Sequence, residues 1–170
     1  MRRALLLLLA GLALSASVLA ASTTPGLVGA ATRLDDSLSP RQRVQATTRW
    51  VYEGTGDWTS DQLSALVAEV PTMEFRLRTA PYVGHDAEIY LSIPRGVIGL
   101  KSPTAMRLEW TTRGLFIPGS LLPGSRTLVY RGRITDPLMT GYFDFRVFLD
   151  SRTSELGIEF DPTFEIELLP

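Results

Sequence analysis

The single histidine of the chain, His85, is followed directly by Asp86 and, two residues later, by Glu88. A histidine beside a carboxylate is the kind of pair that general acid–base catalysis uses, if a further group orients it. On an extended strand the two acids would share one face about 6.6–6.8 Å apart, a spacing that suits paired carboxylates. Gly84, however, is typical of a turn. We therefore interpret this stretch as a solvated turn that opens a strand.

The residue types of the chain disfavour most other chemistries. The chain has no cysteine and only one histidine, which excludes thiol catalysis and thiolate metal sites and disfavours imidazole metal sites. It contains neither a G-x-S-x-G nucleophile motif nor a phosphate-binding loop, and the glycines at 54–56 are too short a stretch for a dinucleotide site. We predict no catalytic residue, no metal site and no cofactor, and we expect a protein that is not an enzyme.

Several aspartates of the chain could in principle act in hydrolysis or bind calcium, because both use carboxylate groups. Asp144 and Asp150 could form the carboxylate pair of a glycosidase, but acids at alternate positions of a strand are ordinary surface residues. Four further aspartates do not form a dense calcium-ligand pattern: Asp35, Asp36, Asp57 and Asp161. A hydrolase that works through paired acids is therefore the least favoured function.

The stretch RGLFIPGSLLPGS, residues 113–125, is unusually apolar for a connection between strands. It either folds over the end of a β-sandwich and plugs the core, or stands exposed as a docking patch. A second apolar connection, residues 93–103, could lie at the same end or at the opposite end. The predicted binding residues come from the first stretch, with one tryptophan added: Leu115, Phe116, Ile117, Leu121, Leu122 and Trp50.

Aromatic residues offer a second way of binding, because sugars stack on tryptophan and tyrosine rings. Of the three tryptophans, Trp110 falls on an inward strand position and Trp58 can pack against a helix start. This leaves Trp50, with Tyr82, as contacts for a carbohydrate or lipid. One unassigned tryptophan does not make a stacking platform.

Apolar and polar residues alternate in several segments after Pro71, which predicts strands with one buried face. The expected fold is mainly β with a minor α+β part: an antiparallel immunoglobulin-like or fibronectin-like β-sandwich of about 6–7 strands, preceded by one or two short helices. The predicted inward residues are Met73, Phe75, Leu77, Ile89, Leu91, Ile93, Met106, Leu108, Trp110, Leu128, Tyr130, Ile134, Phe143, Phe145, Val147 and Leu149, and then, in a hairpin that turns at Asp161-Pro162, Leu156, Ile158, Phe160, Phe164, Ile166 and Leu168.

Two helix-start signals precede these strands. Ser39-Pro40 combines a capping residue with a proline at the first helical position, and residues 43–53 beyond it suit a helix or a strand equally. Thr59 and Gln62 form a capping box. Apolar residues at helical spacing then continue to Pro71, where the predicted helix ends: Leu63, Leu66, Val67 and Val70.

The first residues have the three parts of a secretory signal peptide. Two arginines precede the apolar run from Ala4 to Leu14, and small residues then favour cleavage after Ala20, with Ala21 as the alternative. We expect a signal peptide at 1–20, a flexible leader at 21–38, a short helical segment at 39–71 and the β-sandwich domain at 72–170. The apolar run is short for a membrane anchor, and we expect no membrane span after cleavage.

The charge balance favours no particular partner. The chain has 17 basic and 18 acidic residues, and the loss of Arg2 and Arg3 would leave 15 against 18, a net charge of −3. The basic residues are scattered, which excludes a nucleic-acid footprint. We expect an exported, periplasmic or extracellular, non-catalytic protein that contacts another envelope or secreted protein through residues 113–125 or an exposed edge strand. The alternative is a carbohydrate- or lipid-binding module. The sequence leaves the oligomeric state open.

Overall fold

The computed structural model describes residues 29–40, 47–50, 65–150, 152, 154–159 and 161–170. Within these ranges the chain is almost entirely β-structure, and the predicted mainly β class is confirmed. Two short 3₁₀ turns, η2 (Ala80–Tyr82) and η3 (Pro103–Ala105), lie between strands. The strands are β1 (Thr32–Arg33), β2 (Thr47–Trp50), β3 (Ala65–Arg78), β4 (Asp86–Ser92), β5 (Ile98–Leu100), β6 (Met106–Arg113), β7 (Gly119–Leu121), β8 (Arg126–Arg133), β9 (Leu138–Asp150), β10 (Ser154–Glu159) and β11 (Thr163–Leu168).

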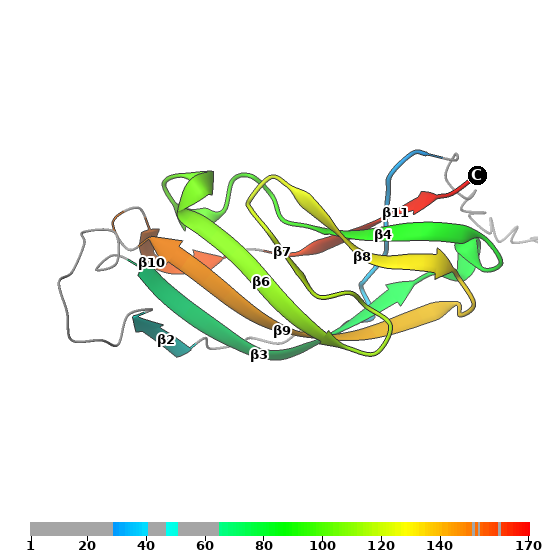
Figure 1. Ribbon diagram of the computed structural model, residues 1–170, viewed down its shortest axis with the longest axis horizontal. Coiled ribbons are helices and arrows are strands. Elements are labelled where there is room, and N and C mark those ends of the chain that lie inside the picture. The colour runs from blue at the N-terminus through cyan, green and yellow to red at the C-terminus, as the bar shows by residue number, and fades with distance from the viewer. Residues whose placement is uncertain (1–28, 41–46, 51–64, 151, 153, 160) are drawn as a thin grey trace, which may run out of the picture.

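The strands form antiparallel sheets, as the alternating pattern predicts. A four-stranded sheet has the order β1-β11-β4-β8, and a five-stranded sheet has the order β2-β3-β9-β6-β7. The long strands β3 and β9 run along most of the molecule, and β10 pairs with β5 in a two-stranded ribbon at one end (Figure 1). The two larger sheets face each other across a shared core, so each of them has one inner and one outer face.

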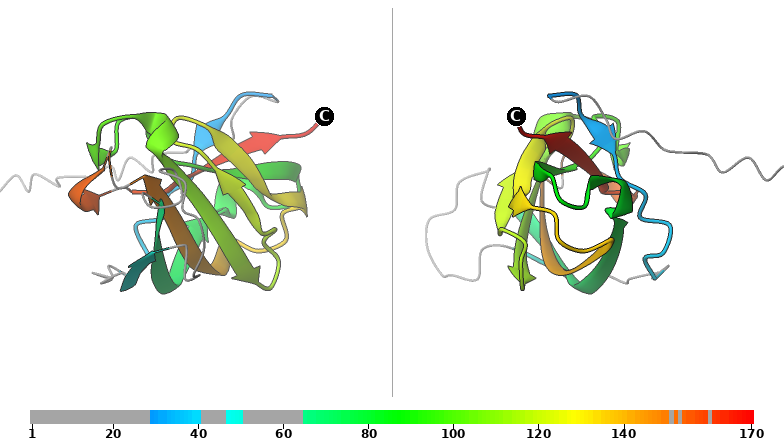
Figure 2. Two further views of the ribbon diagram at one scale, coloured as in Figure 1. Left: turned by 60° about the vertical axis from the view of Figure 1, so that its left-hand side comes forward. Right: turned by 90° about the vertical axis from the view of Figure 1, so that its right-hand side faces the viewer.

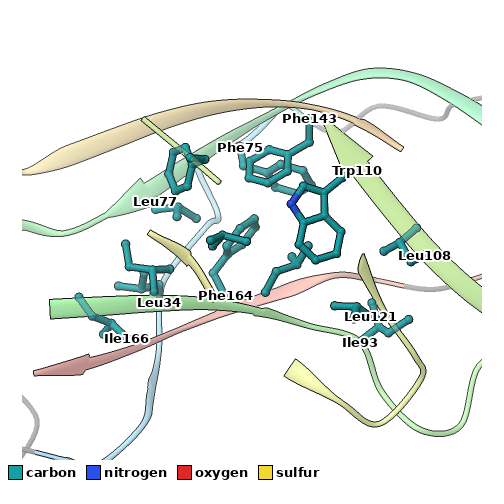
Figure 3. Packing of buried hydrophobic residues seen from close by; sticks show 14 of the residues in the cluster. Leu34, Phe75, Leu77, Ile93, Leu108, Trp110, Leu121, Phe143, Phe164 and Ile166 are labelled. Atoms are coloured by element: carbon teal, nitrogen blue, oxygen red, sulfur yellow. The ribbon is translucent and has the colours of Figure 1, made fainter. Parts of the chain in front are cut away.

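Phenylalanine rings join the two sheets. The ring centroid of Phe164 on β11 lies 5.0 Å from that of Phe75 on β3 and 5.7 Å from that of Phe143 on β9. Figure 3 shows these rings meeting between the sheets, with Trp110 beside them. Burial of one such side chain contributes roughly 1.5–3 kcal/mol, so this cluster is a main source of stability in a chain that has no disulfide.

Most of the predicted inward residues are buried, with an error in β8. Residues of β4, β6, β9 and β11 occupy the core as predicted. In β8 the structure buries Val129, whereas Leu128 and Tyr130 are only partly buried. Ile89 faces Tyr130 but Tyr90 faces Leu128, so Val129 is the extra residue of a β-bulge. The bulge shifts the alternation by one residue, which a strict period of two does not predict.

The predicted helix that ends at Pro71 is wrong for the residues that the structure describes. Residues 65–70 belong to β3, which continues through Pro71 to Arg78. Val70 pairs with Phe145 and Met73 with Phe143, so Pro71 and Thr72 together stand opposite one residue, Asp144. A bulge tolerates proline, which has no amide proton to donate. Residues 59–64 lie outside the described residues.

No helix precedes the strands in the described part of the chain. Residues 41–46, which follow Ser39-Pro40, lie outside it. Residues 47–50 form β2, which pairs with β3, so the strand alternative for this stretch is confirmed there.

The predicted C-terminal hairpin is also wrong in its pairing. β10 pairs with β5, whereas β11 lies between β1 and β4. The connection at Asp161-Pro162 therefore carries the chain from one sheet to another. The inward residues of β11 are buried as predicted, and the side chains of Leu156, Ile158 and Phe160 lie outside the description.

Residues 32–36, expected in the flexible leader, form a strap that bonds to both larger sheets. The amide of Leu34 donates to the carbonyl of Phe164 in β11 over 2.8 Å, and the amide of Arg78 in β3 donates to the carbonyl of Asp35 over 2.9 Å. The Leu34 side chain is only 2% exposed. The blue segment at the side of the end-on view shows this path (Figure 2). The expected signal peptide at 1–20 lies outside the described residues.

Candidate functional site

The outer face of the five-stranded sheet carries a groove with a volume of about 800 Å³. We call it the sheet groove. Backbone atoms of β3, β6, β7 and β9 form its floor, and outward side chains of these strands supply its polar groups. The outward residues that line it are Glu69, Glu109, Thr111, Ser120, Asp144 and Arg146.

Strand register places four of these residues in one row. Glu69 of β3 is opposite Arg146 of β9, which is opposite Glu109 of β6, which is opposite Ser120 of β7. Because neighbouring strands lie about 4.8 Å apart, adjacent side chains of the row can contact one ligand together. Acceptors and a cationic donor thus alternate across the groove.

The charges of this row are paired but remain accessible. Arg146 Nε lies 3.7 Å from Glu69 Oε1, and Glu109 Oε1 lies 2.9 Å from a guanidinium nitrogen of Arg107. The side chains of these two ion pairs are each between about a third and two thirds exposed. Ion pairs this exposed contribute roughly 0–1 kcal/mol, so they stabilise the fold little and can exchange partners with a ligand.

A second polar row depends on the bulge at Pro71. The Thr72 hydroxyl donates to Asp144, and Arg113 donates to the Thr72 oxygen over 2.7 Å. Arg113 also lies 3.4 Å from Asp144. Tyr142, two residues from Asp144 on β9, follows in the next row and is 41% exposed. Tyr142 thus lies on the same outer face, beyond the residues that line the groove.

This arrangement is suited to holding a polar ligand through many hydrogen bonds. Asp144 and Glu109, the acids nearest the centre of the groove, are each bonded to an arginine or a threonine. Arginine and carboxylate groups bind hydroxyl groups as donors and acceptors. The apolar part of the lining comes from Val70, Pro71, Trp110 and Phe145.

The predicted docking stretch, residues 113–125, is not one loop. β7 divides it into a turn at 114–118 and a turn at 122–125. Phe116 and Leu121 are each 4% exposed and belong to the core, so neither side chain is available to a partner. The other three predicted residues of the stretch are exposed: Leu115, Ile117 and Leu122.

Phe116 is buried because β9 has a glycine where the ring lies. A Cβ atom at Gly141 would come within 2.7 Å of the Phe116 ring. The ring centroid of Phe116 also lies 5.4 Å from that of Phe143. The turn at 114–118 thus plugs the core with one ring while it exposes the two residues beside that ring.

The second apolar connection, residues 93–103, lies against the turn at 122–125. The amide of Gly124 donates to the carbonyl of Ile93 over 3.0 Å. The two connections therefore meet at the β8 start, away from the turn at 114–118. Of the aromatic contacts predicted for a sugar or lipid, Tyr82 is buried and the Trp50 side chain lies outside the described residues.

His85 lies in an exposed turn before β4, as interpreted from the sequence. Its amide donates to the Tyr82 carbonyl over 3.1 Å, and Gly84 has φ of +89°. Glu88 accepts from the Tyr90 hydroxyl and lies 3.3 Å from Arg131. The Glu88 bond is the first cause of a raised pKa of Tyr90. None of these groups lines the sheet groove.

The other acids considered from the sequence have structural partners or lie apart. Asp150 binds Arg152, and Asp35 binds Ser37 and Arg78. Among the described residues, no three histidine, cysteine, aspartate or glutamate side chains are close enough to hold a metal ion.

Sequence reasoning missed the sheet groove. Alternation does place Glu109 and Arg146 in polar positions, but only the strand register brings them together with Glu69. That register joins residues far apart in the chain, and β3 was predicted as helix where Glu69 lies.

No family model, curated protein or solved structure matches the chain. In the described part of the chain, no helix has the length and apolar character needed to cross a bilayer.

Proposed function

We propose that the protein is a non-catalytic binding module that holds a polyhydroxylated ligand, a segment of a glycan, in the sheet groove. The observation that carries the proposal is the row Glu69–Arg146–Glu109–Ser120 across a groove of about 800 Å³. Neighbouring hydroxyl groups of a sugar both donate and accept hydrogen bonds, which matches a row of alternating carboxylate, guanidinium and hydroxyl groups.

Two further features support a glycan. The groove is lined by residues of four strands and has a volume of about 800 Å³, which gives room for an oligosaccharide segment. Tyr142, on the same outer face two residues from Asp144, exposes a ring that can stack on the apolar face of a sugar. The proposed binding site therefore lies on the outer face of the five-stranded sheet, and not at Trp50 and Tyr82 as the sequence suggested.

We infer that the protein acts outside the cytoplasm, from the signal-peptide pattern of residues 1–20. We also infer that the two facing sheets form a β-sandwich of broadly immunoglobulin-like architecture. Such an architecture serves many functions, so the functional proposal depends on the groove alone.

The test is binding of the full chain to an array of neutral and acidic glycans. The variant E109Q/R146Q removes both central charges of the row while it keeps a polar side chain at each position. We expect it to weaken binding at least about tenfold, because hydrogen bonds to charged groups contribute about 1.5–3 kcal/mol. Its free energy of unfolding should change by less than about 1 kcal/mol.

The matched control is R131Q, an exposed arginine on the outer face of the other sheet. It should bind glycans as the wild type does. An array without any bound glycan, or equal binding by E109Q/R146Q and the wild type, would refute the proposal.

A second candidate function is contact with another envelope or secreted protein through the turn at 114–118. It is favoured by Leu115 and Ile117, which are exposed on either side of the buried Phe116. This surface is smaller than the predicted stretch of residues 113–125, because β7 and two buried side chains divide that stretch.

A further inference from the structure

We propose a second binding site, independent of the sheet groove, that takes the phosphate group of a phosphate ester. It is a groove of about 560 Å³ where β8 and β11 begin, and we call it the arginine groove. Three arginines from separate segments line it: Arg33 of β1, Arg95 of the connection after β4, and Arg126 of β8.

Arg126 has a structural role in this groove. A guanidinium nitrogen of Arg126 lies 2.6 Å from Glu167 and 3.6 Å from Glu165. The guanidinium also lies over the Tyr90 ring, 4.4 Å from its centroid. These contacts hold the Arg126 side chain against β4 and β11 at one wall of the groove.

Arg33 and Arg95 have no such partners. Among the described residues, neither guanidinium makes a hydrogen bond or an ion pair, and both residues are exposed. Arg33 stands opposite Glu165 in the strand register, but Glu165 already binds Arg126 and accepts from the Ser92 hydroxyl over 3.3 Å. Two uncompensated guanidinium groups therefore line one groove.

The residues that line the groove carry one net positive charge, because three arginines stand against Asp161 and Glu165. Arg126 is paired with Glu167 and Glu165, so Arg33 and Arg95 are the arginines of the lining that have no partner among the described residues. Ser92 and Thr163 also line the groove, with their hydroxyl oxygens 2.9 Å apart, and their hydroxyl hydrogens are used in the bonds to each other and to Glu165.

The position of Arg95 is fixed by the turn that packs on it. Gly124 has φ of +81°, and a Cβ atom there would lie 3.0 Å from the Arg95 Cβ. The Gly124 amide bonds to the Ile93 carbonyl, and the Ser125 hydroxyl donates to the Leu122 carbonyl. The backbone on both sides of the groove is therefore held before a ligand binds, which lowers the entropic cost of binding.

Phosphate is the anion that best fits two unpaired guanidinium groups. One guanidinium fork saturates the two oxygens of a carboxylate, whereas a phosphate group has enough oxygens for both forks. The volume of the groove exceeds that of a bare phosphate, so the ligand carries a further polar part. Soluble phosphate esters and phospholipid headgroups share this chemistry.

The test uses glycerol phosphate as the probe, titrated into the full chain by calorimetry at constant ionic strength, with glycerol as the blank. We expect saturable binding by the wild type and at least about tenfold weaker binding by R33Q/R95Q. R131Q should bind as the wild type does, because Arg131 lies outside the groove. E109Q/R146Q should also bind normally, which separates this site from the sheet groove.

Vesicles distinguish the two sources of the phosphate group. Co-sedimentation with phosphatidylglycerol vesicles, but not with phosphatidylcholine vesicles, that depends on Arg33 and Arg95 would support a headgroup. Binding of glycerol phosphate alone would support a soluble ester. Equal binding of glycerol phosphate by R33Q/R95Q and the wild type would mean an adventitious ion effect and would overturn the proposal, as would no binding by the wild type.

Discussion

At the scale of single residues, the turn at 114–118 divides its apolar side chains between the core and the surface. Phe116 occupies the space that Gly141 leaves in β9, while Leu115 and Ile117 remain exposed. Hydrophobicity alone does not separate these residues. Phe116 is buried because it faces Gly141 of β9, where the absent side chain leaves space for its ring.

This division predicts opposite results for two pairs of substitutions. F116S/L121S should lower the free energy of unfolding by more than about 4 kcal/mol, because each change empties a packed site. L115S/I117S should change it by less than about 1 kcal/mol. Urea denaturation followed by tryptophan fluorescence measures both. Similar losses for the two variants would contradict the division, and loss of a captured protein partner by L115S/I117S would support the second candidate function.

At the scale of elements, the alternating strands after Met73 were predictable, because side-chain direction within a strand is a local property. Pairing was not, since β11 joins β4 and β1 across long stretches of chain. The helix prediction failed in β3 because Leu66, Val67 and Val70 fit a helical face as well as a strand. Pairing with β9 makes this segment a strand. Pro71, which was expected to end a helix, instead lies in a β-bulge that tolerates proline.

The strap at residues 32–36 is the element whose stability should depend most clearly on pH. Hydrogen bonds from the Ser37 side chain and amide, and the charge of Arg78, lower the pKa of Asp35 below 3.8. Because the pKa of Asp35 is lower in the folded state, its ionised carboxylate stabilises the fold at pH values above the pKa that Asp35 has in the unfolded chain. This contribution is lost as the pH falls through the folded pKa.

We therefore expect D35N to be less stable than the wild type at about pH 7 and equally stable at about pH 2. Urea denaturation at both pH values measures the difference. D36N removes the same charge from the neighbouring residue, whose side chain has no hydrogen bond or ion pair within the described residues, and serves as the control. A stability gap between D35N and the wild type that persists at low pH would argue against the ionised carboxylate as the cause.

At the scale of the whole molecule, one core supports two outer surfaces with different charge patterns. The five-stranded sheet presents alternating acids and arginines in the sheet groove, and the start of β8 and β11 presents unpaired arginines in the arginine groove. The sequence supplied the residue types of both surfaces. Neither surface was predictable from it, because each is assembled from three or more strands or connections whose order only the folded chain establishes.

The central claim is that the outer face of the five-stranded sheet binds a glycan. Amide chemical shifts of the ¹⁵N-labelled protein, titrated with the tightest-binding oligosaccharide from the array, test it most directly. If the glycan binds there, the largest shift changes will fall on β3, β6 and β9 around Glu69, Glu109 and Arg146, and the shifts of β1 and of the turn at 114–118 will not change. Shift changes centred on Leu115 and Ile117, or on Arg33 and Arg95, would contradict it.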